Sequence, residues 1–152
     1  MAEFIYNDVQ QVALNAPLVL NNSIRCQKGY ILHENGSAII TLRGIVNNPY
    51  ACFARYRVIA KSNIAIPTGG AVTPIGLAIA LQGEAQPSSR AVITPAAVEE
   101  YGNAVAIANV DVPKGCCFTL SLRYVQATDD PATTPTPGIE AQNTIVIIDR
   151  TA

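Results

Sequence analysis

The segment Phe118-Thr-Leu-Ser-Leu-Arg-Tyr124 alternates apolar and polar residues without a break. Successive side chains of a β-strand point to opposite faces of its sheet, so this alternation predicts a strand with one buried face. Residues 54–60 repeat the pattern, with Arg55 and Arg57 alternating with apolar residues, and residues 37–43 follow it as well. The three segments together predict a protein built from antiparallel strands.

A turn signal separates two of the predicted strands. Asn35-Gly36 lies between residues 30–34 and residues 37–43. Asn and Gly both adopt positive φ readily, as a two-residue type I′ turn requires, so we predict a tight β-hairpin here. Further turn signals stand at residues 67–70, 86–89 and 112–115. They divide the chain into about eight or nine short strands, a pattern typical of a sandwich or jelly roll.

A helix is predicted only at residues 94–102. Thr94 can act as an N-cap, Pro95 suits the first helical position, and Gly102 can end the helix. Such a segment allows about one or two turns. The chain has no internal repeat of the length found in solenoids and propellers, which excludes those architectures.

Residues 126–142 are predicted to form a long loop before the last strand. The segment is rich in Pro, Thr and Asp and contains no aromatic residue. Loops of this length are usually functional or disordered. We expect the loop to face outward and to expose three polar contact candidates, which are Asp129, Asp130 and Thr134.

Several predicted strands are apolar on both faces, namely residues 77–81, 104–112 and 143–150. One face can pack in the core of a sandwich, and the other face then needs a second cover. Charged residues are also scarce, at 14% of the chain against about 25% in ordinary soluble domains. Both observations indicate more apolar surface than one subunit can bury.

Three kinds of protein could account for this surplus: a membrane protein, a protein with an unusually large core, and a subunit of an assembly. A membrane-spanning helix needs about 18 consecutive apolar residues, and every apolar run in this chain is far shorter. A chain of 152 residues is an ordinary single domain without room for an oversized core. We therefore predict that sister copies or a partner protein cover the surplus, and that the protein does not enter a membrane.

Net charge and the first residues exclude two further classes. The net charge is −1 and no basic run is present, whereas binding to a phosphate backbone requires clustered Lys and Arg. We therefore expect no nucleic-acid partner. The start Met1-Ala-Glu-Phe4 lacks the basic and apolar regions of a secretory signal, so we expect assembly in a cytoplasm.

Catalytic chemistry has little support in the sequence. His33 is the only histidine, and no nucleophile motif surrounds it or any cysteine. Zinc needs three or four ligands, and the acidic pairs Glu99-Glu100 and Asp129-Asp130 lack the alternating ligands of a calcium loop. Calcium in the 126–142 loop stays open as an alternative. We predict no enzyme activity, no metal and no cofactor.

The cysteines and one tyrosine complete the set of candidates. Neighbouring Cα atoms lie about 3.8 Å apart, closer than the roughly 4.4–6.8 Å of an unstrained disulfide, so Cys116 and Cys117 should not pair with each other. We expect all four cysteines to be reduced and mostly buried. Tyr50 is the best candidate for an exposed aromatic ring that could stack on a sugar, with packing or an interface role as the alternative.

A family resemblance rests on several short motifs. Among them are Gly29-Tyr-Ile-Leu-His-Glu-Asn-Gly-Ser37, Cys52-Phe-Ala-Arg-Tyr56, Thr94-Pro-Ala-Ala-Val98 and Val112-Pro-Lys-Gly-Cys-Cys-Phe118. In this order they resemble small proteins coded near capsid genes in phages and prophages of gut Gram-positive bacteria. The fold of those proteins is similar to the TNF/C1q-like jelly roll. The resemblance implies an all-β antiparallel jelly-roll sandwich that forms trimers and decorates the phage head, so that the protein would reside on the virion.

The resemblance implies the trimer contacts, and the apolar run Phe4-Ile5-Tyr6 indicates the capsid contact. We expect residues 1–15 to be a docking segment, with Phe4, Ile5 and Tyr6 contacting the major capsid protein, and residues 16–152 to form the jelly roll. We expect the trimer interface to use apolar faces of three strands, through Leu77, Ile79, Val105, Ile107, Phe118, Leu120 and Tyr124.

Two other function classes remain open. The chain could be a fibre tip or adhesin that binds a host-surface glycan, in which case a glycan array would give hits competed by free sugar. It could also be an enzyme, for which replacing His33 by alanine is the discriminating experiment.

Overall fold

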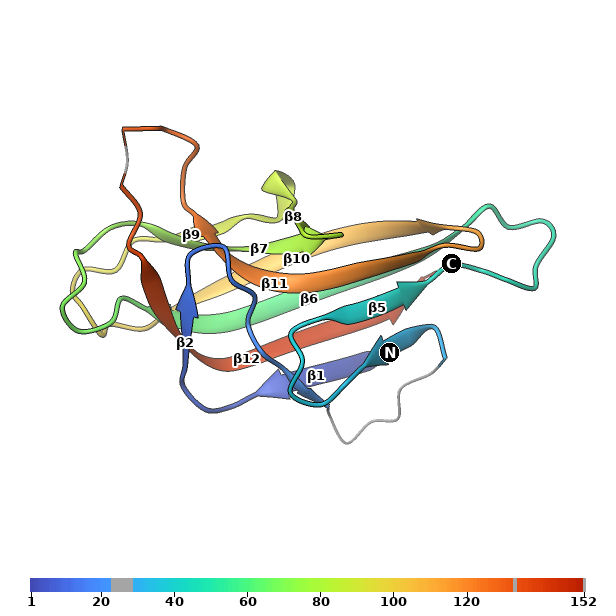
Figure 1. Ribbon diagram of the computed structural model, residues 1–152, viewed down its shortest axis with the longest axis horizontal. Helices are drawn as coiled ribbons and strands as arrows, with labels where there is room; N and C mark the ends of the chain where they lie inside the picture. The colour runs from blue at the N-terminus through green and yellow to red at the C-terminus, as the bar shows by residue number, and fades with distance from the viewer. Residues whose placement is uncertain (23–28, 133, 152) are drawn as a thin grey trace.

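Two antiparallel six-stranded sheets face each other in the computed structural model, which describes residues 1–22, 29–132 and 134–151 (Figure 1). Sheet A has the strand order β10-β6-β12-β1-β3, and β2 pairs with β12 beside β1. Its strands are β1 (Ala2–Tyr6), β2 (Gln10–Ala13), β3 (Asn21–Asn22), β6 (Phe53–Ala65), β10 (Gly102–Pro113) and β12 (Gly138–Arg150).

Sheet B has the order β4-β5-β11-β7-β8, and β9 also pairs with β7. Its strands are β4 (Ile31–His33), β5 (Ile40–Arg43), β7 (Ile75–Leu81), β8 (Glu84–Ala85), β9 (Ala91–Ile93) and β11 (Cys117–Gln126). A 3-10 turn, η1 (Pro87–Ser89), joins β8 to β9. Consecutive strands often belong to different sheets, which is the connectivity of a jelly roll. The predicted all-β antiparallel sandwich is confirmed.

The core lies between the sheets and follows the alternation read from the sequence. In β6, Tyr56 and Val58 are fully buried, while Arg55 and Arg57 are exposed. In β11, Leu122 and the other apolar residues of the quoted segment point inward. Each buried Leu, Ile, Val or Phe contributes about 1.5–3 kcal/mol relative to an exposed position, so the alternating strands fix which face of each sheet is inner.

The hairpin of β4 and β5 forms, but its turn is not the predicted one. A two-residue type I′ turn would pair Ile31 with Ile40, whereas Ile31 pairs with Leu42. Gly36 has φ +83°, but Asn35 is not among the residues with positive φ. The amide of Ser37 donates to the carbonyl of Glu34, which closes a turn with positive φ only at its third residue, as in type II.

The helix predicted at residues 94–102 is wrong. Residues 96–99 form bends and a turn, the residues on either side of them are irregular, and Gly102 begins β10. Glu99 has φ +60°, a conformation that no α-helix contains. Its amide donates to the carbonyl of Ile66 in another loop, so tertiary hydrogen bonding replaces the helical pattern. Within the described residues, no helix is long and apolar enough to cross a membrane.

The boundary expected after residue 15 does not separate two parts. Strand β1 pairs with β12 from Ala2 to Tyr6, and β2 pairs with β12 from Gln10 to Ala13. Beyond β2, the amide of Leu18 donates to the carbonyl of Leu122 in sheet B. Residues 1–15 are therefore part of the sandwich and not a segment separate from the jelly roll.

Candidate interaction surfaces

The outer face of sheet A carries a band of aliphatic side chains that the described residues leave partly or largely exposed. Strand register places Ile107, Ile59, Ile147 and Glu3 in one row across β10, β6, β12 and β1. The next row runs Val105, Lys61, Ile145 and Ile5. We call the six aliphatic residues of these rows the apolar band: Ile5, Ile59, Val105, Ile107, Ile145 and Ile147.

The side chains of the apolar band are unusually exposed for aliphatic residues. Ile107 is 56% exposed and Val105 is 46% exposed, and the other four are partly exposed. Isolated exposed aliphatic residues are common, but six on neighbouring strands of one sheet face form an apolar patch of the kind found at contact surfaces.

Polar rows border the apolar band on both sides. One border consists of the amides Asn103, Asn63 and Gln142. The other border begins with Arg57, whose Nη2 lies 3.6 Å from Oδ2 of Asp149. An apolar centre with a polar rim is the usual composition of a protein–protein interface.

A bidentate ion pair follows beyond this second border. Arg55 donates from Nε and Nη2 to the two carboxylate oxygens of Asp111, at 2.7 and 2.9 Å. The hydrogen bond from Arg55 is the main cause that holds the pKa of the Asp111 carboxyl below its ordinary value. The pair therefore stays charged at neutral pH, which keeps this border hydrophilic.

The predicted trimer-interface residues divide into two groups. Leu77, Ile79, Leu120 and Tyr124 are 0–1% exposed and belong to the core between the sheets. They cannot contact another subunit, because β7 and β11 use those faces to pack against sheet A. The exposed members of the set are Val105 and Ile107, and Phe118 is partly buried.

The predicted docking residues are also divided. Phe4 is 1% exposed and packs at 4.7 Å, centroid to centroid, on the ring of His33. Its role is therefore in the core and not in docking. Ile5 belongs to the apolar band, and Tyr6 is partly exposed. The prediction missed Ile59, Ile145 and Ile147, although the apolar run in residues 143–150 contained the signal for two of them.

The loop between β11 and β12 is shorter than the predicted 126–142, because β12 already begins at Gly138. Its acidic residues are exposed, but they have structural partners. The side chain of Asp129 is 85% exposed and accepts a 2.9 Å hydrogen bond from Nη2 of Arg90. Asp130 accepts from the amide of Ala132, and Thr134 is exposed. No group of three or more His, Cys, Asp or Glu residues that could hold a metal ion occurs in the described parts of the chain.

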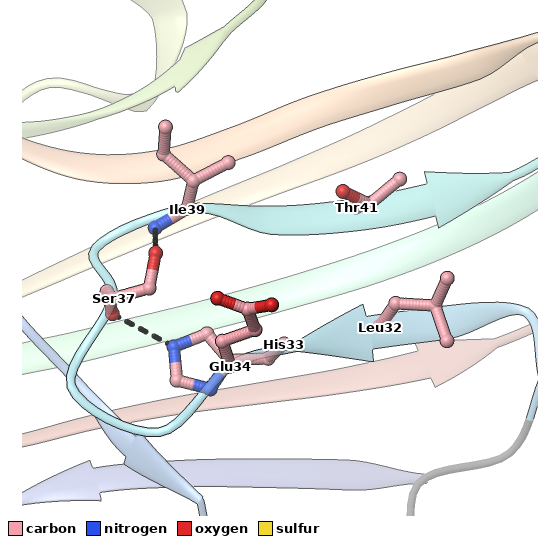
Figure 2. Close-up of a pocket in the computed structure, with 6 residues that line it drawn as sticks. All are labelled: Leu32, His33, Glu34, Ser37, Ile39 and Thr41. Atoms are coloured by element: carbon pink, nitrogen blue, oxygen red, sulfur yellow. Dashed lines mark hydrogen bonds between the residues drawn. The ribbon is translucent and has the colours of Figure 1, made fainter.

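A shallow hollow of 440 Å³ lies beside the β4–β5 hairpin (Figure 2). Its lining includes His33, Glu34 and Ser37 together with exposed Ile39. Nε2 of His33 donates a 2.8 Å hydrogen bond to the carbonyl of Ser37, and the ring is only 8% exposed. His33 therefore holds the hairpin on the core.

Three of the cysteines contradict the prediction of burial. Cys52, Cys116 and Cys117 are free and exposed. They follow or precede turns at one end of the sandwich, where the amide of Lys114 donates to the carbonyl of Cys52. Cys26 lies outside the described residues.

Comparison with solved structures identifies the type of sandwich. Eiger TNF from S. frugiperda superimposes with a TM-score of 0.62 at 9% sequence identity, over 99% of this chain and 91% of that chain. The chain has a TNF-like jelly-roll fold. Murine APRIL gives a TM-score of 0.49 at 10% identity, over 92% of this chain and 96% of that one.

A third similar structure is the C-terminal domain of EclA, a sugar-binding protein, with a TM-score of 0.41 at 12% identity over 95% of this chain and 79% of that chain. No protein-family model matches the sequence, and no curated protein matches it either. The superposition on Eiger TNF establishes the TNF-like fold. A sequence identity this low establishes nothing about activity or partners. The function therefore has to be argued from the surface.

Proposed function

We propose that the chain is a non-enzymatic structural subunit that forms a trimer through the apolar band and decorates the outside of a phage head. The observation that carries the assembly is the apolar band, six aliphatic side chains with a polar rim on one sheet face. The resemblance of the sequence motifs to proteins coded near phage capsid genes supports the setting. The major capsid protein is the proposed partner.

A second copy is the occupant that best fits the apolar band. The band spans four adjacent strands, β10, β6, β12 and β1. Obligate interfaces between copies bury roughly 2,000–5,000 Å² and are more apolar than transient ones. At about 25 cal/mol per Å² of apolar surface removed from water, such a contact gains tens of kcal/mol before the entropy of association is subtracted.

The assembly is tested by placing a charge in the apolar band. Ile107→Asp should convert the assembly to monomers, because an unpaired carboxylate buried at each interface costs about 3 kcal/mol or more. The monomer should still fold, since Ile107 is 56% exposed in a single chain. Analytical ultracentrifugation with circular dichroism measures both properties.

Val92→Asp is the matched control for this variant. Val92 is 46% exposed and lies opposite Gly76 in sheet B. The control should remain a trimer. A wild-type chain that sediments as a monomer at micromolar concentration would remove the basis for the proposed assembly.

The phage role is tested on particles. Mass spectrometry of purified virions from a phage that carries this gene should find the chain in a fixed ratio to the major capsid protein. Electron microscopy of heads with and without the gene should show added density on the outer surface. Particles that lack the chain while it is expressed in the host would exclude decoration.

Glycan binding is a second candidate, and one observation favours it. Tyr50 is 94% exposed on a loop that also holds Asn47 and Asn48. Aromatic rings and amides together are suited to bind sugars, by stacking and by hydrogen bonding. Reproducible glycan-array signals that vanish in Tyr50→Ala would support this candidate.

A further inference from the structure

The loop between β5 and β6, residues 44–52, projects beyond the strands at one end of the sandwich (Figure 1). No charged residue occurs from Gly44 to Ala54. Two large apolar side chains of the loop are unusually exposed, Val46 at 68% and Tyr50 at 94%. Exposed aromatic residues on projecting loops are typical anchors of protein contacts.

The base of this loop is fixed to the rest of the sandwich. The amide of Gly44 donates to the carbonyl of Cys116, and the amide of Lys114 donates to the carbonyl of Cys52. A Cβ atom on Gly44 would lie 2.1 Å from the carbonyl oxygen of Pro113, so the two turns pack as closely as glycine allows. These contacts hold both stems of the loop in place.

The loop has its own turn at the tip and a buried residue near its base. The amide of Tyr50 donates to Oδ1 of Asn48 at 3.0 Å, which forms an Asx turn. Ile45 is 7% exposed and packs in the core cluster. The loop is therefore preorganised, and docking through Tyr50 would lose little conformational entropy.

Charges are divided between the two ends of the sandwich. The strand directions place five cationic side chains near the β5–β6 loop, against two carboxylates, Asp111 and Asp149. The cations are Arg43, Arg55, Arg57, Lys114 and Arg150. At the opposite end six carboxylates stand against two arginines, Arg90, which pairs with Asp129, and Arg123; the carboxylates are Asp8, Glu99, Glu100, Asp129, Asp130 and Glu140.

Two of the cations near the loop are available to a partner. Arg43 and Lys114 are exposed and form no ion pair in the described residues. Arg55, in contrast, is already paired with Asp111. A basic rim around an apolar anchor is complementary to an acidic protein surface with a pocket for an aromatic ring. A neutral glycan would gain nothing from that rim.

We propose that the end bearing the β5–β6 loop is the capsid-docking end, and that Tyr50 and Val46 insert into an acidic surface of the head while the carboxylate-rich end faces outward. This inference rests on the proposed function. It replaces the docking residues expected in β1, because Phe4 is buried and Ile5 belongs to the apolar band. The proposed trimer uses the face of sheet A, so this end stays free in every copy.

The test uses DNA-free heads from a phage in which the gene has been deleted and measures binding of the full chain by cosedimentation. Loss of an anchor residue commonly weakens binding by about 30-fold or more. We expect that loss for Val46→Ser combined with Tyr50→Ser. Val72→Ser combined with Val98→Ser is the matched control, since both side chains are exposed on loops at the opposite end, and it should bind as the wild type does.

Two further measurements test the basic rim and the orientation. Arg43→Glu combined with Lys114→Glu should weaken binding and flatten its dependence on salt, because fewer attractive charges remain to be screened. In a Cys26→Ser background, bound heads should protect Cys52, Cys116 and Cys117 from alkylation.

Several results would overturn the inference. If the wild type decorates heads and Val46→Ser/Tyr50→Ser binds equally well, the docking end is wrong while the proposed function stands. The same holds if the Val72→Ser/Val98→Ser control loses binding, or if Tyr50 proves to be needed only for a glycan. If the wild type does not bind heads, both the proposed function and this inference fail.

Discussion

Tyr124 of β11 joins the core between the two sheets to the loop that precedes β12. Its ring is fully buried, and its hydroxyl donates a 2.8 Å hydrogen bond to the carbonyl of Thr136. Burial disfavours the phenolate and raises the pKa of Tyr124 to about 12 from the ordinary 10.0. The folded state therefore holds a proton that the unfolded state releases above pH 10.

Replacing Tyr124 by Phe tests both roles of the hydroxyl. At pH 7 the variant should lose about 1–3 kcal/mol of stability, since the Thr136 carbonyl loses its buried partner. The raised pKa contributes stability that is complete below pH 10 and is lost as the pH rises toward about 12. The stability of Tyr124→Phe should therefore fall less steeply than that of the wild type between pH 9 and 11, measured by urea unfolding. Equal slopes would show that Tyr124 does not carry this dependence.

At the scale of elements, the strands were predictable and their connections were not. Alternation in β6 and β11 reports burial directly, because period two assigns each side chain to one face. The turn at Gly36 and the loop at Glu99 depend on partners far along the chain, such as the carbonyl of Ile66. Local signals for a type I′ turn and for a helix were overridden by these tertiary contacts.

The same limit applies to the candidate surface. The sequence indicated that β7, β10 and β12 are apolar on both faces, but it could not say which face meets the opposing sheet. In β7, Ala78 and Ala80 on the outer face are also buried, at 1% and 0% exposure, so that strand contributes nothing outside. Only register across β10, β6 and β12 reveals the apolar band.

The loop of residues 127–137 offers a prediction at this scale. Asp129→Ala removes the ion pair with Arg90 that ties the loop to the segment after η1. Because the Asp129 side chain is exposed, we expect a loss of less than about 1 kcal/mol in global stability. Proteolysis within the loop should nevertheless become faster, as mass spectrometry of limited digests would reveal. Asp8→Ala is the control, and an unchanged cleavage rate in Asp129→Ala would show that the ion pair does not restrain the loop.

At the scale of the whole molecule, the proposed assembly links the apolar band to stability. If sister copies cover the band, folding and association are coupled, and the unfolding temperature depends on protein concentration. A monomeric sandwich has no such dependence. The wild type should therefore melt at a higher temperature as its concentration rises, in calorimetric scans over a hundredfold range.

Ile107→Asp serves as the monomeric reference for the calorimetric scans. Its charge should abolish association, so its unfolding temperature should be lower than that of the wild type and independent of concentration. Val92→Asp should keep the concentration dependence, because its charge lies on the other sheet. A wild-type unfolding temperature that stays constant over the whole range would mean that one subunit is stable with its band exposed, and the surface would then have to serve a partner other than a second copy.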